Sequence, residues 1–214
     1  MTRAQTALVL HALALTALMF MAVPWLTRNY GGPAGWFASI VLYWALFCIP
    51  VIVIHLGRAG LSDLMRIGLG PGQGWVLWLL GVQVALVAIG TTLTMEVDLV
   101  MGVIGLAILT ALINGTLEEA AWRGGFYRVF GDRRALGFGL GLFLFTLWHV
   151  PLALAEGIDY GTGGAAALIG GSALLGLVWS TVMWRTGSVF WVSLAHVATN
   201  VFAFAALFSS NGFV

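Results

Sequence analysis

The sequence has little charge, no lysine and a single cysteine. Charged residues make up 8% of its 214 residues, against about a quarter in a typical soluble domain. So few charges cannot cover a surface that faces water, and we expect lipid to be the solvent of this chain. All nine basic residues are arginines, and they form no basic cluster of the kind that binds nucleic acid. Cys48 has no partner for an intrachain disulfide and is interpreted as a small buried hydrophobic residue.

Hydrophobic residues account for 61% of the chain and occur in long continuous runs. In hydrocarbon every backbone polar group needs a partner within the protein, so only helices and closed barrels span a membrane. Continuous runs favour helices, whereas alternating runs would indicate barrel strands. Seven runs come near the ~20 residues that a span requires, at 7–26, 36–56, 75–93, 100–122, 135–155, 165–184 and 188–208. The sequence therefore predicts an all-α fold, a polytopic transmembrane helix bundle of about seven spans that forms a single membrane domain over 1–214.

The first run is longer than the ~7–15 apolar residues of a signal peptide, so we expect it to be a retained span. The arginines fall mainly on one side of the membrane when the connecting loops are numbered alternately. One side receives Arg3, Arg58, Arg66, Arg123, Arg128, Arg133, Arg134 and Arg185. The other side receives Arg28 together with four acids, Glu96, Asp98, Glu156 and Asp159. Because basic residues accumulate in cytoplasmic loops, the N-terminus is predicted in the cytoplasm and the C-terminus outside.

The location follows from the same counts. Arginine in the complete absence of lysine is typical of a GC-rich bacterial genome, so the predicted location is the bacterial cytoplasmic (inner) membrane.

Two adjacent carboxylates stand near the end of the fourth run. Neighbouring residues of a helix point ~100° apart, so Glu118 and Glu119 face different directions. Arg123 lies four residues beyond Glu119 on the same face, which predicts a structural ion pair between Glu119 and Arg123. Glu118 would then remain available for chemistry. By themselves, these carboxylates are equally consistent with solvation of a helix end.

Two further helices carry polar side chains within apolar runs. His149 follows Phe145 by one turn in the fifth run, and His196 and Asn200 share one face of the seventh run because four residues separate them. Each histidine alone is also consistent with a hydrogen-bonded group in a helix core. Ionisable side chains inside a membrane are costly and usually functional. We therefore predict that three helices converge and that Glu118, His149, His196 and Asn200 share one pocket.

Three motifs in this region resemble those of a known family. They read Glu118-Glu119-x-x-x-Arg123, Phe145-x-x-x-His149 and His196-x-x-x-Asn200, and Arg185-Thr-Gly-Ser188 precedes the last of them. In order and character they are similar to the motifs of the CPBP family, which includes the type II CAAX prenyl endopeptidases and many bacterial relatives. The resemblance covers a motif-bearing core at 113–200, and the first three runs carry no motif.

This resemblance implies an intramembrane endopeptidase. Glu118 and His149 resemble the pair that activates water, and His196 and Asn200 resemble the pair that stabilises the oxyanion. The implied substrate is a membrane-associated peptide or protein, and the expected partners are membrane lipid and, in some settings, a membrane protein complex. Neither a cofactor nor nucleic acid is expected.

Two alternatives stay open. Glu118, His149 and His196 would also make the His₂Glu ligand set of a zinc metalloprotease, with one zinc ion as cofactor, although the chain has no His-Glu-x-x-His element. The chain could instead be a catalytically inactive relative that acts as a scaffold or assembly subunit.

Helix rise gives an expectation for the depth of the site. At ~1.5 Å per residue, His196 lies ~12 Å beyond Ser188 and Glu118 lies ~7.5 Å before Arg123. Both distances are measured from the arginine-bearing loops, so we expect the cavity to be reached from the cytoplasmic side. His149 fits this depth least well, at ~21 Å from the start of its run.

Overall fold

The computed structural model describes residues 1–94 and 100–213, so Glu96, Asp98 and Val214 lie outside the described part. Seven helices in this part are long and apolar enough to cross a membrane, and no strand is found among the described residues. The candidate spans are Arg3–Tyr30, Gly32–Leu64, Trp75–Leu93, Met101–Val129, Arg134–Leu152, Gly164–Thr186 and Val189–Ser210. The predicted all-α bundle of about seven spans is therefore confirmed.

Five of these spans are single α-helices, and the second and fourth spans are built from several helical pieces. The elements in chain order are α1 (Arg3–Tyr30), α2 (Gly32–Tyr43), η1 (Trp44–Cys48), α3 (Ile49–Val51), η2 (Ile52–Leu56), α4 (Gly57–Leu64), α5 (Trp75–Thr94), α6 (Met101–Glu118), η3 (Glu119–Gly125), α7 (Phe126–Val129), α8 (Arg134–Leu152), α9 (Gly164–Thr186) and α10 (Val189–Ser210). The η elements are π-helical turns, which are wider than α-helical turns and are frequent at functional sites.

The second and fourth spans extend well beyond their predicted limits of 36–56 and 100–122. Pro33 lies in the first turn of α2, where a backbone N–H would have no partner within the helix. In the fourth span, the helix passes through Gly124 and Gly125 because both pack closely. A Cβ added at Gly125 would lie 2.7 Å from the Val51 Cγ1 atom. These glycines therefore allow close helix packing and do not end the helix.

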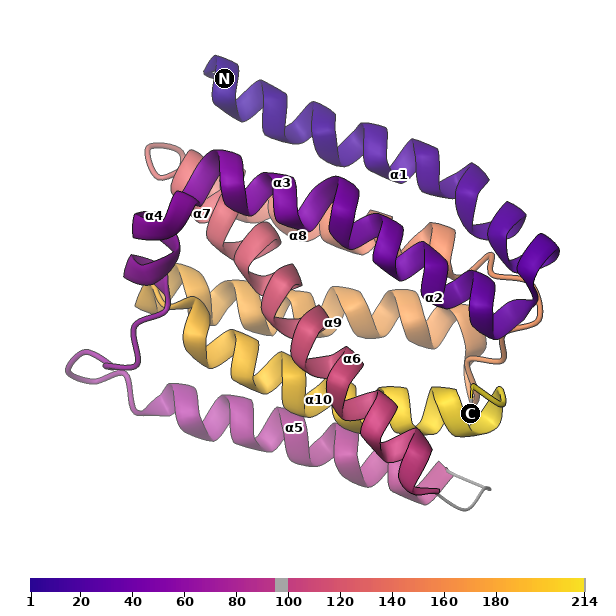
Figure 1. The fold of residues 1–214 in the computed structure, drawn as a ribbon. Coiled ribbons are helices and arrows are strands. Elements are labelled where there is room, and N and C mark those ends of the chain that lie inside the picture. Colours follow the sequence, from indigo (N-terminus) through magenta and orange to yellow (C-terminus); the bar gives the residue numbers. More distant parts are fainter. Residues whose placement is uncertain (95–99, 214) are drawn as a thin grey trace.

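The longer fourth span corrects the arginine count. Arg123 is 2% exposed and lies inside the helix Met101–Val129, so it is not a loop residue. Seven of the eight arginines assigned to one side remain there. They belong to the end of the bundle where α4, α7, the start of α8 and the α9–α10 junction meet (Figure 1). We call this end the arginine-rich end.

The opposite end holds the α1–α2 junction, the loop between α8 and α9 and the C-terminal end of α10 (Figure 1). Arg28 forms an ion pair with Glu156 there, and the Glu156 backbone N–H donates to the Thr27 hydroxyl at 3.0 Å. The hydrogen bond from Arg28 lowers the pKa of the exposed Glu156 carboxyl. We call this end the arginine-poor end.

Helix α10 lies in the centre of the half of the bundle that carries the motifs, packed against α5 and α6. It crosses α6 very closely at Gly115. A Cβ at Gly115 would lie 2.8 Å from the backbone nitrogen of Val197, the residue after His196. Since Gly115 precedes Glu118 by less than one turn, this close crossing brings Glu118 and His196 together.

Candidate active site

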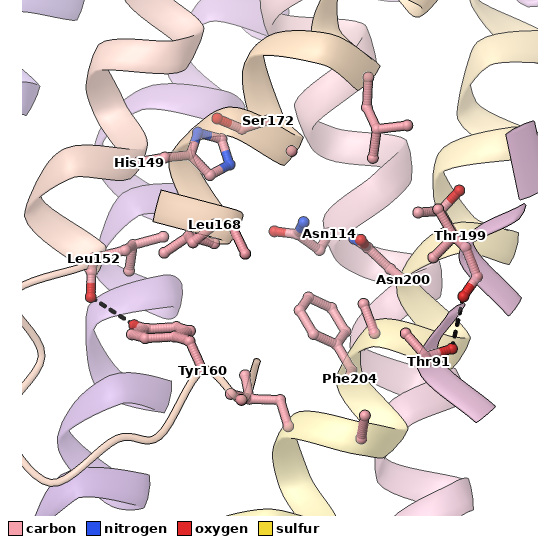
Figure 2. A pocket seen from close by; sticks show the side chains of 18 of the residues that line it. Thr91, Asn114, His149, Leu152, Tyr160, Leu168, Ser172, Thr199, Asn200 and Phe204 are labelled. Carbon is pink, nitrogen blue, oxygen red and sulfur yellow. Dashed lines mark hydrogen bonds between the residues drawn. The ribbon is translucent and has the colours of Figure 1, made fainter. Parts of the chain in front are cut away.

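A cavity of about 590 Å³ is lined by residues of α2, α5, α6, α8, α9 and α10 and of the α8–α9 loop. Its volume is in the range of ~300–1,000 Å³ that is usual for ligand pockets. The four residues predicted to share a pocket, Glu118, His149, His196 and Asn200, all line it. Figure 2 shows His149 on one wall and Asn114 with Asn200 across the open space.

The Glu118 carboxylate is held by two neutral donors. The side chain is 3% exposed. The Trp148 indole N–H donates to Oε1 at 3.3 Å, and the Asn114 amide donates to Oε2 at 3.1 Å. Trp44, in the π-helical turn η1, donates in turn to the Asn114 carbonyl oxygen at 2.8 Å, which fixes the orientation of that amide. The carboxylate is thus oriented from two sides without a salt bridge to an arginine.

Glu119 forms the predicted ion pair with Arg123, at 3.1 Å between Oε1 and a guanidinium nitrogen. The pair is fully buried, and the Arg123 guanidinium stacks over the Phe145 ring at 3.8 Å. Glu119 has a second contact that the sequence did not indicate: the Nδ1 atom of His196 lies 2.8 Å from the same oxygen. Glu119 is therefore more than the partner of Arg123, because it also orients a residue of the cavity wall.

His196 lies between the two carboxylates. Its Nδ1 atom faces Glu119, and its Nε2 atom lies 3.5 Å from Glu118 Oε2. The ring stacks on Trp179 with the centroids 4.1 Å apart. Trp179 donates to Gln83 of α5 at 3.1 Å, so α5 and α9 together fix the plane of the imidazole. Because Nδ1–H is engaged by Glu119, Nε2 is the atom that His196 presents to the cavity.

His149 is held in one tautomer. Its Nδ1 atom lies 2.8 Å from the Phe145 carbonyl oxygen, which can only accept a hydrogen bond. Nδ1 therefore carries the proton, and in the neutral ring Nε2 is a hydrogen-bond acceptor. Phe145 sets the orientation of this histidine through its backbone, one turn earlier in α8.

Asn200 presents an unused donor. Its Nδ2 atom is buried and has no hydrogen-bond partner in the part of the chain that the structure describes. A buried donor without a partner costs roughly 1–3 kcal/mol. Such a group is usually explained by a ligand or a function, and here it belongs to a residue of the cavity wall.

The residues that hold Glu118 and His196 were not identified from the sequence. They are Asn114, Trp148, Trp44, Trp179 and Gln83. Tryptophan and asparagine within apolar helices carry no motif, and Trp44 lies 70 residues from its partner Asn114. The available signal was the position of Asn114, one turn before Glu118 on the same helix face, and of Trp148 beside His149.

The residues of the zinc alternative do not assemble into a ligand set. Among the residues that the structure describes, no group of three or more His, Cys, Asp or Glu side chains could hold a metal ion. His196 directs one ring nitrogen to each of two carboxylates, so its orientation is set by Glu118 and Glu119. We therefore derive no step through a metal.

The lining of this cavity does not reach the arginine-rich end, from which access was expected. Its lining extends through Tyr160 and Thr162 of the α8–α9 loop to Ser210, all at the arginine-poor end. The estimate of depth failed because the fourth span continues to Val129, eleven residues beyond Glu118 or ~16 Å at 1.5 Å per residue. His149 lies near the arginine-poor end of α8, so its estimated depth disagreed with a depth for Glu118 that was too shallow.

Comparison with known proteins supports the identity suggested by this arrangement. Fold and site define a polytopic membrane protein with a buried glutamate–histidine cavity. Residues 100–202 match the family described as Type II CAAX prenyl endopeptidase Rce1-like, and this segment contains all three motifs. This match over the motif-bearing part of the chain is consistent with the predicted CPBP resemblance. At a coarse level, the matched family implies an intramembrane endopeptidase. No curated protein and no solved structure matches the chain.

Proposed function

We propose that the protein is an endopeptidase that hydrolyses a peptide bond of a membrane-associated peptide or protein inside the bilayer. The observation that carries this proposal is the convergence of Glu118, His149, His196 and Asn200 on one cavity, with the Asn200 amide donor unused. A pocket that combines basic acceptors with an unpaired donor suits acyl transfer to water, because that reaction needs both a proton acceptor and oxyanion donors.

Water activation is assigned to Glu118 and His149. The Glu118 carboxylate lines the cavity, and Trp148 and Asn114 fix its position. His149 offers Nε2 as a second acceptor, because Phe145 holds the proton on Nδ1. One water bound between these acceptors would lose a proton to Glu118 as its oxygen attacks the carbonyl carbon. The proton then passes to the leaving amine, as general acid–base catalysis requires.

Oxyanion stabilisation is assigned to His196 and Asn200. The Asn200 amide donates without losing a proton, so its donor strength does not depend on pH. His196 donates through Nε2 when it is doubly protonated, because Nδ1–H remains on Glu119. Removing one oxyanion donor typically costs 10²–10³-fold in kcat, and the same loss is expected for Asn200→Ala.

We also place the protein in the bacterial cytoplasmic membrane, with its N-terminus in the cytoplasm. The arginine-rich end supports this orientation, since arginine accumulates on the cytoplasmic side. No metal ion takes part in the proposed reaction.

The test compares membranes that contain the wild-type chain with membranes that contain Glu118→Gln. Quantitative proteomics of membrane peptides should reveal cleavage products that disappear in Glu118→Gln while the protein still accumulates. Glu156→Gln is the matched control, because it removes a carboxylate that lies outside the cavity, and it should leave the products unchanged. Exhaustive chelation should leave them unchanged as well.

Three outcomes would contradict the proposal. Identical product profiles for the wild-type chain and Glu118→Gln, together with recovery of the chain in a stoichiometric membrane complex, would favour the scaffold alternative. Loss of activity on chelation that zinc alone restores would favour the metalloprotease. Equal loss of products in Glu118→Gln and Glu156→Gln would contradict the assignment of Glu118 as the general base.

A further inference from the structure

We infer that the cavity takes an uncharged, apolar stretch from the interior of a polypeptide and receives it from the arginine-poor end. This inference names the substrate class of the site and rests on the proposed function for the reaction that follows binding. It rests on three observations about the cavity: where its lining reaches the surface, which charges its lining contains, and which polar atoms it leaves unused.

The lining of the cavity reaches the surface at the arginine-poor end. Asp159 and Thr162 of the α8–α9 loop are exposed and belong to the lining, as does Ser210 at the end of α10. The same loop is fixed to the neighbouring elements, because the Asp159 N–H donates to the Asn211 side chain at 2.7 Å and Tyr160 donates to the Leu152 carbonyl at 2.5 Å. Hydrogen bonds therefore hold the mouth of the cavity in place at this end.

The opposite end is closed by packed side chains. Leu56, Leu64 and Val189 surround Gly124 there, each within 3.3 Å of the position that a Cβ would take. The Ser188 hydroxyl donates to the Arg66 carbonyl at 2.6 Å across the same end. None of these residues belongs to the cavity lining.

The charges of the lining disfavour an anionic ligand. Of the described residues that line the cavity, Glu118 and Asp159 carry formal charge, and none is an arginine. The nearest cation at this end is Arg28, and its guanidinium is paired with Glu156. Burial raises the pKa of Tyr160, so this hydroxyl at the mouth is neutral. A carboxylate that enters a poorly solvated cavity needs a cationic partner. The imidazole of His196, the lining group that the proposed reaction protonates, already lies between the carboxylates of Glu118 and Glu119.

A free chain terminus with a carboxylate is therefore a poor ligand, whereas an internal segment without charge is a good one. The wall is largely apolar, with Leu168, Leu175, Phe204 and Leu207 among its side chains. Gly171 and Ala203 add small residues to the same wall and leave room for a main chain. An extended segment brings its own backbone carbonyls, and the unused Asn200 amide lies where one of them can accept a hydrogen bond.

Thiol labelling tests the route of entry without requiring proteolysis. In a Cys48→Ala background, single cysteines are placed at the mouth (Thr162→Cys), deep in the cavity (Ser172→Cys and, independently, Ala203→Cys) and at the arginine-rich end (Arg133→Cys). Sealed membrane vesicles of both orientations are treated with a membrane-impermeant trimethylammonium thiosulfonate. The mouth and deep positions should react in one vesicle orientation, and Arg133→Cys should react in the other. Deep positions that react from the same side as Arg133→Cys would overturn the route.

Protection by a defined peptide tests the ligand class. The labelled variants also carry Glu118→Gln so that the peptide is not consumed. An acetylated, amidated leucine–alanine hexapeptide should slow labelling at Ser172→Cys at least fivefold. The same peptide with a free C-terminal carboxylate should give equal protection only at a concentration at least tenfold higher. Labelling at Arg133→Cys should not change with either peptide.

Failure of the inferred ligand class can be distinguished from failure of the proposed hydrolysis. Equal protection by both peptides, or no protection by the amidated one at Ser172→Cys and Ala203→Cys, would overturn the ligand class whatever the chemistry of the site. Protection by the amidated peptide, combined with no cleavage by the wild-type chain, would leave the binding site standing and remove the proposed hydrolysis.

Discussion

Glu118 owes its position to residues that have no charge. Trp148 and Asn114 donate to its two oxygens, and the Trp148 indole itself stacks on Tyr43 with the ring centroids 3.9 Å apart. Neutral donors orient a carboxylate without neutralising it as an arginine would, which suits a group that must accept a proton. Trp148 and Asn114 are thus positioning residues, because they act through Glu118.

Trp148→Phe separates orientation from packing. Phenylalanine keeps an aromatic ring against Tyr43 and removes the N–H that donates to Glu118. A hydrogen bond to a charged group is worth about 1.5–3 kcal/mol, so we expect kcat to fall by at least tenfold with KM nearly unchanged. Trp191→Phe is the control, since its indole donates to the Ile67 carbonyl away from the cavity. Equal effects of the two variants on kcat would contradict the positioning role.

The buried pair of Glu119 and Arg123 makes a different prediction. Arg123→Ala and Glu119→Gln each leave a partner with less than its full pairing in a site that is at most 2% exposed. Breaking such a pair typically costs about 3–5 kcal/mol, which thermal unfolding in detergent should register as a large drop in Tm for Arg123→Ala. Glu119→Gln should also lower activity in the fraction that folds, because Nδ1 of His196 loses its carboxylate. A stable and fully active Glu119→Gln would refute both roles.

At the scale of residues, the sequence predicted the four cavity residues but not the residues that position them. The four cavity residues are ionisable or strongly polar groups in apolar helices, so their cost in lipid made them visible. Trp148 and Trp44 cannot be distinguished by sequence from other tryptophans in apolar helices, because their hydrogen-bond partners are visible only in the structure. The contact of Glu119 with His196 joins positions 77 residues apart and depends on the helix crossing at Gly115, which spacing alone does not reveal.

Among the elements, the crossing of α6 and α10 matters most for the site. It depends on the absence of a side chain at Gly115, where a Cβ would meet the α10 backbone at 2.8 Å. A backbone atom cannot move aside as a flexible side chain can, so a larger residue must separate the two helices. Separation would lengthen the 3.5 Å approach between Glu118 and His196.

Gly115→Ala should therefore lower kcat by about tenfold or more and should lower Tm as well. Gly105→Ala is the matched control, because Gly105 lies on the same helix with nothing within 4 Å of its added Cβ. That variant should keep its activity, with stability unchanged or slightly higher because alanine favours helix over glycine by roughly 0.8–1.0 kcal/mol. Full activity of Gly115→Ala would show that the site tolerates a wider crossing.

The ends of the elements were predicted less well than their centres, and the errors have a common cause. Gly124 and Gly125 follow a charged cluster, a pattern that is typical of a helix end in water. Inside the bundle the same glycines admit Val51 and Val189 against the helix, so the helix continues. Tertiary packing decided these boundaries, and packing was invisible in one sequence.

The whole molecule has two chemically different ends. Seven arginines lie at one end and Arg28 at the other, and this asymmetry predicts a preferred orientation in the membrane. Alkaline phosphatase fused after Asn211 should be active, and the same reporter fused after Gly70 should be inactive, with the opposite pattern for a fluorescent protein that folds only in the cytoplasm. Phosphatase activity at Gly70 would invert the orientation and place the mouth of the cavity on the cytoplasmic face.

The π-helical turn η3 makes the fourth span sensitive to changes in length. A π turn closes its hydrogen bond from i to i+5, so it contains one residue more than an α turn in the same position. Losing Gly125 would preserve every residue of the cavity and every spacing within the three motifs. It would nonetheless let the turn tighten into an α-helix and rotate Phe126–Val129 by ~100° against α8. The extra residue of η3 therefore sets the rotation of the turn that follows it, so the length of this segment matters for the packing of Phe126–Val129 even though these residues lie outside the cavity.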